Sequence, residues 1–486
     1  MIKKIFSEIE EIIVELFKKE EIWFFLLLLI VSGGYFSYFL IIQGIDFDKA
    51  LVIIRDFLAA SWWLWLFFIL LPITLSTWLY WRNELFKSQI KWTLLELKIP
   101  RENTKNPKAM EQVLTAMHSL RNTPSNFQER WVDGELTRWF SLEIVSFGGE
   151  IHYYIRLYKK QKNLVEAAIY SYYPDVEVVE VEDYVNKFPS SVEEMYSQGY
   201  DLWGTEMLLT KPSFYPIKTY PHFVEVQHEE KMVDPMSAFL EVLGKLKPGE
   251  IVGIQILIAP AGDKWRFLVS PEKGWPHKWQ DELEKLRAPK QRKTQGVSGE
   301  GGIEASQAIS LRSPDETNIL KEVENNLSKP AFNTLIRFIY LSPKETFYDS
   351  YASRGLVGAF NQYGALNLNS FRQNHRVSTR TLFWYFPYFF PNLRNELKKQ
   401  RLLRNYRLRD LPPETFMGKI ISSHPLNWNT ASKTFEMNTE CLATLFHVPT
   451  ETVLTTPHIQ RIESQKVSPP VGLPIFGEEE EIEKFK

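Results

Sequence analysis

Three basic residues, Arg394, Lys398 and Arg401, recur at positions i, i+4 and i+7. This spacing places them on one face of a helix, where they could contact the phosphates of a nucleic acid. More cations lie close by, at Lys399, Arg404, Arg407 and Arg409. The alternative is an ordinary solvated helix face, which the net charge of −2 favours because such a chain has no overall attraction for nucleic acid. Nucleic acid is therefore an alternative partner, not the expected one.

Motifs for catalysis, metal binding or cofactor binding are missing from the sequence. None of the nine histidines pairs at i, i+4, and the single cysteine, Cys441, excludes a multi-cysteine zinc site and internal disulfides. Ser298 lacks the G-x-S-x-G context of a nucleophile, and the glycines around it precede no GK[ST]. No Walker A motif occurs anywhere in the chain, which speaks against P-loop nucleotide hydrolysis. We expect no catalytic residue, no metal, no cofactor and no enzyme.

A second set of candidate groups is acidic. Glu177, Glu180, Glu182 and Asp183 alternate with valines along a predicted strand and its end. Successive strand residues point to opposite faces, so solvent-facing carboxylates explain this pattern better than a pair of catalytic acids does.

Two long apolar runs, 22–42 and 58–81, stand near the start of the chain and contain no Asp, Glu, Lys or Arg. Each is long enough to cross a hydrocarbon core of about 30 Å as a helix. Tryptophan and tyrosine residues flank the second run, as at membrane interfaces. The sequence thus predicts a two-helix transmembrane anchor over residues 22–82.

Lysine and arginine placement predicts the orientation of this anchor. Lys3, Lys4, Lys18 and Lys19 precede the first run, and Arg82, Lys87 and Lys91 follow the second, whereas only Lys49 and Arg55 lie between them. The positive-inside bias puts both termini and the large body in the cytoplasm, at the inner membrane. Before the anchor, residues 1–21 form an amphipathic helical pattern, which fits a helix on the membrane surface, an extension of the first span, or a helix packed on a partner.

The body begins with a β-α-β-β-α-β pattern over residues 92–185. The expected strands are 92–98, 139–147, 151–158 and 176–181, the expected helices are 107–120 and 162–173, and Gly148-Gly149 marks a hairpin. This order is typical of a ferredoxin-like unit.

The same order repeats over residues 200–375, after a polar linker at 187–199. The expected strands are 206–210, 251–259, 332–341 and 365–371, and the expected helices are 235–246 and 345–363. An insertion between the central strands contains helical stretches at 279–286 and 314–327 and a polar loop at 288–311. The predicted fold class is therefore α+β: two transmembrane helices followed by tandem ferredoxin-like units.

The remaining chain, residues 376–474, contains an aromatic segment at 383–391 and then the basic stripe. The aromatic segment is too short to span a bilayer, and we expect it to pack inside the body or against another subunit, with membrane-surface contact as the alternative. An acidic tail occupies residues 475–486.

Within this last region, residues 437–449 read MNTECLATLFHVP, followed by Thr456-Pro457 and by PPVGLP at 469–474. This pattern resembles the segment that precedes the motor domain in type IV secretion and conjugation coupling ATPases. NLNSF at 367–371 and the double membrane anchor are also similar to the front region of that family.

The chain departs from the family where the phosphate-binding strand and loop should begin, since the acidic tail follows Pro474. The family's ATP-binding residues therefore have no counterparts here. The resemblance implies the membrane-anchored front half of a coupling ATPase without its motor. It predicts a non-enzymatic inner-membrane subunit, homo-oligomeric, that anchors or recruits a separate hexameric ATPase for DNA or protein translocation. The alternative function is a membrane-tethered nucleic-acid-binding module that uses the basic helix.

Overall fold

The computed structural model describes most of the chain between residues 59 and 450. The described residues are 52, 55–56, 59–100, 103–223, 234–264, 272–287, 313–348, 351–380, 389–427, 431–450 and 461–462. The predicted surface helix 1–21, the first apolar run, the loop 288–311 and the acidic tail lie outside these residues.

The first half of the body follows the predicted order. Its elements are β1 (Trp92–Pro100), α5 (Lys108–Ser119), β2 (Phe140–Phe147), β3 (Glu150–Tyr158), α6 (Lys162–Tyr172) and β4 (Glu177–Val181). In space the strands lie in the order β4-β1-β3-β2, and all neighbours are antiparallel. Gly148 and Gly149 have positive φ, which supports the predicted hairpin between β2 and β3.

The second half repeats this arrangement with interruptions. Its elements are β5 (Tyr200–Leu209), α8 (Ser237–Gly244), β6 (Ile251–Pro260), β7 (Ala331–Pro343), a helical segment made of η6 (Tyr351–Leu356), α11 (Val357–Ala359) and η7 (Phe360–Tyr363), and β8 (Phe371–Gln373). The strands lie in the order β8-β5-β7-β6. Both halves therefore place their first to fourth strands in the order 4-1-3-2.

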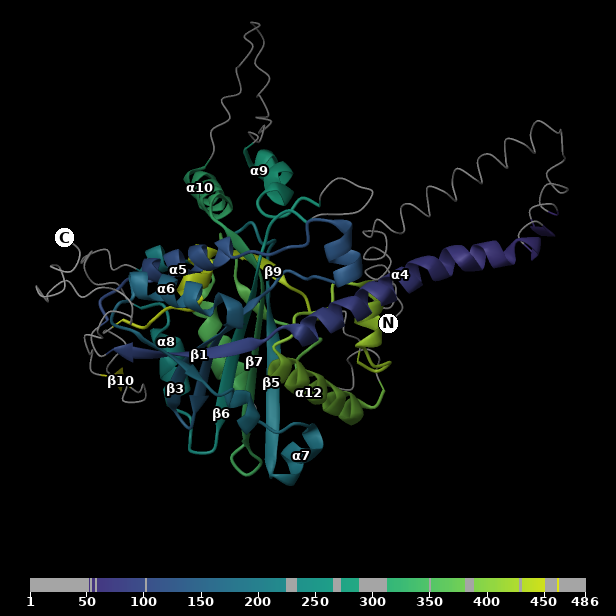
Figure 1. Ribbon diagram of the computed structural model, residues 1–486. Helices are drawn as coiled ribbons and strands as arrows, with labels where there is room; N and C mark the ends of the chain where they lie inside the picture. Colours follow the sequence, from purple (N-terminus) through teal and green to yellow (C-terminus); the bar gives the residue numbers. More distant parts are fainter. Residues whose placement is uncertain are drawn as a thin grey trace, which may run out of the picture.

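The second strands of the two halves join them into one sheet. β2 pairs antiparallel with β6 from Phe140↔Ile258 to Phe147↔Ile251, and the sheet runs β10-β1-β3-β2-β6-β7-β5-β8, where β10 is Arg461–Ile462 (Figure 1). β2 and β6 are almost wholly buried; this explains the near-continuous apolar run of β6, whereas β2 also buries Ser141, Glu143 and Ser146. The predicted α+β class is confirmed, as a mixed fold built on a large antiparallel sheet.

Helices cover both faces of this sheet. On one face, α5, α6, α8 and α14 (Thr439–Leu445) enclose the larger apolar core. On the other face, α7 (Val192–Ser197) and α12 (Pro391–Leu408) pack over a smaller core that includes Leu202, Ile339 and Tyr406. The body is thus a three-layer structure.

The region after residue 376 is part of the same sheet. β9 (Phe435–Asn438) pairs with β7 from Ala331↔Asn438 to Thr334↔Phe435, and α14 follows it directly. The Asn438 side chain accepts the Cys441 N–H and so caps α14. The segment that resembles a pre-motor sequence is therefore a buried strand and helix. Thr456-Pro457 and residues 469–474 lie outside the described part of the chain.

Several local predictions differ from the structure. The predicted linker 187–199 contains α7, which Ser191 caps, and the predicted strand 365–371 is mostly loop, because β8 begins only at Phe371. The predicted helix 345–363 is broken into short helical turns, and Gly355 and Gly358 within it lower its helix propensity. The insertion contains η5 (His277–Trp279), α9 (Gln280–Arg287) and α10 (Pro314–Ser328), close to the predicted helices.

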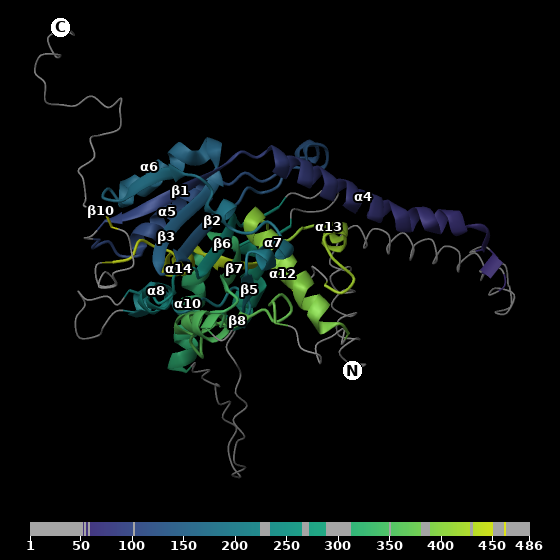
Figure 2. The same ribbon diagram turned by 90° about the horizontal axis from the view of Figure 1, so that it is seen from below.

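The prediction of two membrane-spanning helices is not supported. The first apolar run is undescribed, and within the described residues no helix is both long and apolar enough to cross a bilayer. The second run is helical in α4 (Trp62–Gln89), but α4 continues for eight residues past Trp81 through a polar stretch. Figures 1 and 2 show α4 extending away from the sheet, with its C-terminal part against the body.

Candidate functional site

The predicted basic stripe on α12 faces the body. Arg394 is 3% exposed and Lys398 is 8% exposed, and the Lys398 ammonium donates to the carbonyl of Ser378 at 3.2 Å. Arg401 lines a small polar cavity of about 10 Å³ together with Lys398 and Glu206. The structure thus brings the three predicted residues together, but on the inward side of the helix.

Burial lowers the pKa values of these cations. Burial, with repulsion from Arg394 and Arg401, lowers the pKa of Lys398 to about 8. Burial also lowers the pKa of Arg401 to about 10, although the charge of Glu206 opposes this shift. A nucleic-acid contact through these three side chains stays a prediction, and their inward orientation leaves little of Arg394 and Lys398 for a phosphate.

A row of buried polar residues crosses the centre of the sheet beneath α12. Glu143, Gln255, Arg337 and Glu206 stand opposite one another on β2, β6, β7 and β5. All four are fully buried. Such a row requires internal partners, because a buried unpaired charge is costly.

The C-terminal end of α12 supplies most of these partners. Arg337 binds Glu206 at 3.0 Å and donates to the carbonyl of Asn405 at 2.8 Å, while Gln255 donates to the carbonyl of Tyr406 at 2.9 Å. The last carbonyls of a helix have no partner within the helix, so they are natural acceptors for these donors.

Arg409 directly follows α12 and supplies the charged partner of Glu143, the residue of the row that belongs to the first half. It has a left-handed backbone conformation, and its guanidinium binds Glu143 at 2.7 Å and Asp183 at 2.6 Å. Although burial opposes its charge, Glu143 and Asp183 keep the pKa of Arg409 well above its usual value. These buried ion pairs hold α12 to the sheet.

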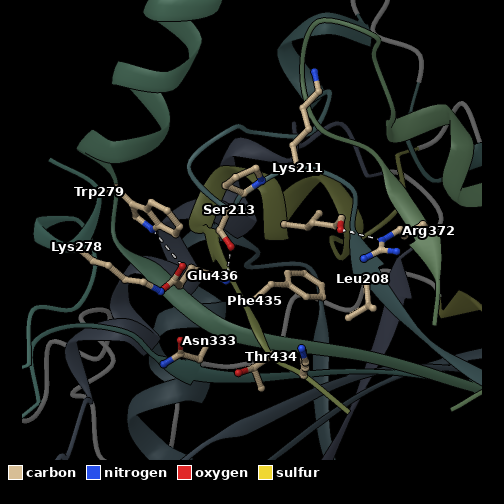
Figure 3. Close-up of a pocket in the computed structure, with 13 residues that line it drawn as sticks. Leu208, Lys211, Ser213, Lys278, Trp279, Asn333, Arg372, Thr434, Phe435 and Glu436 are labelled. Carbon is tan, nitrogen blue, oxygen red and sulfur yellow. Dashed lines mark hydrogen bonds and ion pairs between the residues drawn. The ribbon is translucent and has the colours of Figure 1, made fainter. Parts of the chain in front are cut away.

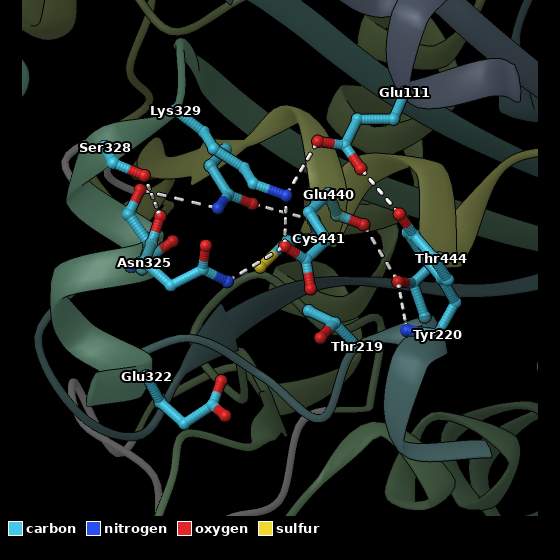
Figure 4. A network of polar contacts seen from close by, with 12 residues as sticks. Glu111, Thr219, Tyr220, Glu322, Asn325, Ser328, Lys329, Glu440, Cys441 and Thr444 are labelled. Carbon is cyan, nitrogen blue, oxygen red and sulfur yellow. Dashed lines mark hydrogen bonds and ion pairs between the residues drawn. The ribbon is translucent and has the colours of Figure 1, made fainter. Parts of the chain in front are cut away.

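A second polar network lies between α5 and α14, on the face of the sheet that these helices cover (Figure 4). The Lys329 ammonium lies between Glu111 of α5, at 2.8 Å, and Glu440 of α14, at 2.5 Å. The Tyr220 hydroxyl donates to the other oxygen of Glu111 at 2.8 Å. Burial opposes the charge of Lys329, but the two carboxylates raise its pKa above the usual value. This network joins α5 to α14.

Cys441 and His447 are also buried in the protein interior. Burial, with the nearby charge of Glu440, raises the pKa of the Cys441 thiol to about 12, so it is not a ready nucleophile. His447 is fully buried, and its Nε2 lies 3.1 Å from Asp234. Burial opposes ionisation of Asp234, but His447 and the N–H groups of Thr450 and Met236 hold its pKa below the usual value. Among the described residues no cluster of histidine, cysteine and carboxylate side chains could hold a metal ion.

A pocket of about 380 Å³ opens where the second half of the sheet divides (Figure 3). β9 and β5 both pair with the same edge of β7, β9 over Ala331–Thr334 and β5 over Arg337–Pro343. The two strands separate at this point because β5 turns to pair with β8. The pocket is lined by Leu208, Leu209, Lys211, Pro212, Ser213, Lys278, Trp279, Asn333, Arg372, Lys433, Thr434, Phe435 and Glu436.

Side-chain hydrogen bonds fix the walls of this pocket. Asn369, fully buried, donates to the carbonyls of Lys211, Pro212 and Tyr215 and accepts the Lys211 N–H at 2.9 Å. Ser213 accepts the Glu436 N–H at 3.2 Å, which ties the same loop to β9. The loop after β5 is therefore held rigidly by its own polar contacts.

The charge of the pocket is positive. Four cations, Lys211, Lys278, Arg372 and Lys433, line it with one acid, Glu436. Lys278 binds Glu436 at 2.8 Å, so the charges of these two side chains offset each other. In the described part of the chain, Lys211 and Arg372 have backbone carbonyl partners, Leu366 and Leu209, and no carboxylate partner.

Sequence reasoning missed this pocket. Its cations come from four separate segments, and none forms a run or a periodic pattern. The nearest signal was NLNSF at 367–371, because its Asn369 organises the loop after β5 and is close in sequence to Arg372.

A second notable surface is the contact between α4 and the body. The Trp78 indole donates to the carbonyl of Trp131 at 2.9 Å, and the Ser76 hydroxyl accepts the Met417 N–H at 3.1 Å. Gly134 has φ +71°, and a Cβ there would lie 2.5 Å from the Arg82 backbone. The helix thus approaches the body too closely for any side chain at that position. Its other end carries exposed Trp63, Leu66 and Leu70.

Comparison with known proteins gives a family but no function. None of the curated proteins compared with the chain matches it. The model of one family matches residues 81–380, which include the last nine residues of α4 and all four strands of each half. Since this match covers more than half of the chain, the protein belongs to the family described as Domain of unknown function (DUF8128).

Proposed function

We propose that the protein is a non-enzymatic subunit of a type IV secretion or conjugation-like translocation machine at the inner membrane. In this role the two apolar runs, 22–42 and 58–81, anchor the chain, both termini and the body lie in the cytoplasm, and the two halves of the sheet are tandem ferredoxin-like units. The body recruits a separate hexameric ATPase and assembles as a homo-oligomer.

One observation carries this proposal: α4 is apolar at its free end and docked at its other end. Trp63 is 61% exposed, and Leu66 and Leu70 are also exposed, whereas Ser76 and Trp78 contact the body. An exposed helix with large apolar side chains requires a cover, and lipid is the cover that the aromatic residues at both ends of this run favour.

The docked end gives the anchor a mechanical role. Trp78 and Ser76 are not the only residues of α4 that contact the body. The Lys87 ammonium lies 3.6 Å from the carboxylate of Asp410, which follows Arg409 in the chain. A rigid connection between anchor and body would fix the orientation of the sheet relative to the membrane. A scaffold that holds a motor in place needs such an orientation.

Membrane attachment is tested by fractionation of cells that express the full chain, with alkaline carbonate extraction. The variant Trp63→Asp/Leu66→Asp/Leu70→Asp should lose a large part of its membrane fraction, because charged groups are costly in lipid. A matched control, Leu164→Asp/Leu366→Asp, changes exposed apolar residues of the body and should remain in the membrane. Equal fractionation of the two variants would contradict the anchor.

Recruitment is tested by purifying the tagged full chain in mild detergent from its native cells. We expect a protein with a Walker A motif to co-purify in a stoichiometric amount. Repeated recovery of the chain without such an ATPase would refute the scaffold function.

A further inference from the structure

Two short elements of the body flank the docked end of α4. They are η1 (Gln128–Asp133), which precedes β2, and α13 (Phe416–Ile421), which follows α12. Both pack against α4, and Figure 2 shows α13 beside it. Since almost 300 residues separate η1 from α13 in the sequence, only the tertiary structure brings them to the same helix. We call the two elements the collar.

The collar contacts α4 from opposite sides. The Ser76 hydroxyl accepts the N–H of Met417 in α13 at 3.1 Å. The Trp78 indole donates to the carbonyl of Trp131 in η1 at 2.9 Å. Trp78 lies two residues beyond Ser76, which is about 200° around a helix. The body therefore holds α4 between two elements at one level of the helix.

This level is where the apolar run of α4 ends. The run closes at Trp81, and the Trp78 and Trp81 rings lie 5.4 Å apart and are both about half exposed. Tryptophan prefers the headgroup level of a bilayer, because its ring is apolar and its N–H is polar. With α4 as a membrane span, the collar lies at the membrane surface. The inference thus rests on the anchor of the proposed function.

The collar itself exposes apolar side chains. Phe127, which begins η1, Val132 within η1 and Ile421 at the end of α13 are each about half exposed. Each lies within about one helical turn, in sequence, of a residue that contacts α4. Glu129, the acid between Phe127 and Val132, accepts the Ser125 N–H at 2.7 Å and so binds its own loop. Apolar side chains gathered beside a membrane span are covered by lipid without any second protein.

We propose that the collar seats the body on the membrane, with Phe127, Val132 and Ile421 inserted at the headgroup level. The occupant of this surface is the lipid interface itself. A span held from two sides, with apolar contacts to lipid on both, cannot tilt independently of the sheet. The collar therefore fixes the orientation of the body relative to the bilayer.

Depth-dependent fluorescence quenching tests the collar on the full chain in vesicles of phosphatidylcholine and phosphatidylglycerol. The single cysteine, Cys441, is buried, so a Cys441→Ala background allows one introduced cysteine at a time to carry the fluorophore. The labelled variants are Phe127→Cys and Ile421→Cys in the collar, Leu70→Cys in the apolar run and Leu164→Cys on α6, all at exposed positions. The quenching lipids carry a nitroxide either at the headgroup or deep in the acyl chain.

Each labelled position has a definite expected result. The headgroup nitroxide should quench Phe127→Cys and Ile421→Cys about twofold more strongly than the deep nitroxide does, because the collar lies at the interface. The deep nitroxide should quench Leu70→Cys, and neither should quench Leu164→Cys. Quenching of Leu70→Cys without quenching of the collar labels would overturn the collar and leave the anchor intact. Absence of quenching at Leu70→Cys would refute the anchor, and the collar with it.

Charged variants show whether the collar inserts into lipid. With the label on Phe127→Cys, Val132→Asp/Ile421→Asp should lower the headgroup quenching about twofold, because charged groups leave the apolar layer. The chain should still resist alkaline carbonate extraction. The matched control, Leu164→Asp/Leu366→Asp, changes exposed apolar residues elsewhere on the body and should leave the quenching unchanged. Unchanged thermal unfolding shows that both variants are folded, and equal quenching in the two would overturn the proposal.

Discussion

The two halves of the sheet share one strand order, but they differ in how completely the fourth strand covers the edge of the first. In the first half β4 covers the edge of β1 over five residues, and no insertion separates β2 from β3. In the second half β8 covers β5 over only three residues, and β9, from the C-terminal region, covers the remaining edge of β7. The pocket lies in the gap that this division leaves.

The polar row shows the same difference. In the second half the charged pair Glu206–Arg337 lies within the sheet, on β5 and β7. In the first half the residues opposite Glu143 on the neighbouring strands are Tyr154 and Gln255, and its ion pair is with Arg409, which comes from beyond α12. The first half is therefore closed by a distant segment, whereas the second half supplies its own ion pair and leaves an open pocket.

The largest effect is expected from Arg409→Met, which leaves Glu143 buried without its charged partner. Loss of one partner of a buried ion pair should lower the free energy of unfolding by about 3–5 kcal/mol. Chemical denaturation measures it, and the double variant Glu143→Gln/Arg409→Met should recover part of the loss. A loss of less than about 1 kcal/mol would show that the first half does not depend on this arginine.

The attachment of α4 to the first half is tested by Gly134→Ala. Gly134 has φ +71°, and an added Cβ would lie 2.5 Å from the Arg82 backbone. The substitution should therefore lower the free energy of unfolding by about 2–4 kcal/mol and release the C-terminal end of α4 from the body. Limited proteolysis between α4 and β1 measures this release. Gly199→Ala is the matched control, because its φ is +77° but no atom lies within 4 Å of the added Cβ. Equal protease sensitivity of the two variants would exclude close docking at Gly134.

Lys398, on the side of the second half, makes stability depend on pH. Its pKa of about 8 in the folded protein lies below its usual value, so the unfolded chain binds more protons between about pH 8 and pH 10. Stability should therefore rise across this range, and Lys398→Met should remove a rise on the order of 1–2 kcal/mol. Thermal unfolding at several pH values measures the difference between the two proteins. Parallel pH profiles would contradict the buried charge.

The smallest effect is expected from Asn438→Ala, at the junction of β9 and α14. Loss of the cap on the Cys441 N–H should cost about 1 kcal/mol. Hydrogen exchange should increase in α14 and in β9, which completes the second half, and remain unchanged in β1 and β4. An equal increase in both halves would show that the two halves open together.

Sequence patterns predicted most strands and helices of both halves to within a few residues. The run at 251–259 was recognisable because a central strand buried on both faces is nearly continuously apolar, and the strand at 139–147 was recognisable from its alternation. The short strand β8 and the broken helix between β7 and β8 were less predictable. β8 has only three residues, too few for a clear alternation, and its pairing with β5 is a long-range contact.

The surroundings of the candidate site residues could not be predicted from the sequence, for a physical reason. Helical spacing correctly placed Arg394, Lys398 and Arg401 on one face of α12, but spacing does not state whether a face points to solvent or to protein. The cations of the pocket Lys211 and Arg372 are more than 150 residues apart, and only the pairing of β5 with β8 brings them together.

The sequence by itself determined the α+β class and the repeated order of elements, because hydrophobic periodicity and turn residues are local properties. The tertiary structure alone decided how the halves join through β2 and β6, that the basic helix turns inward, and that Arg409 pairs with Glu143. These features depend on contacts between residues far apart in the chain, whose partners leave no periodic signal.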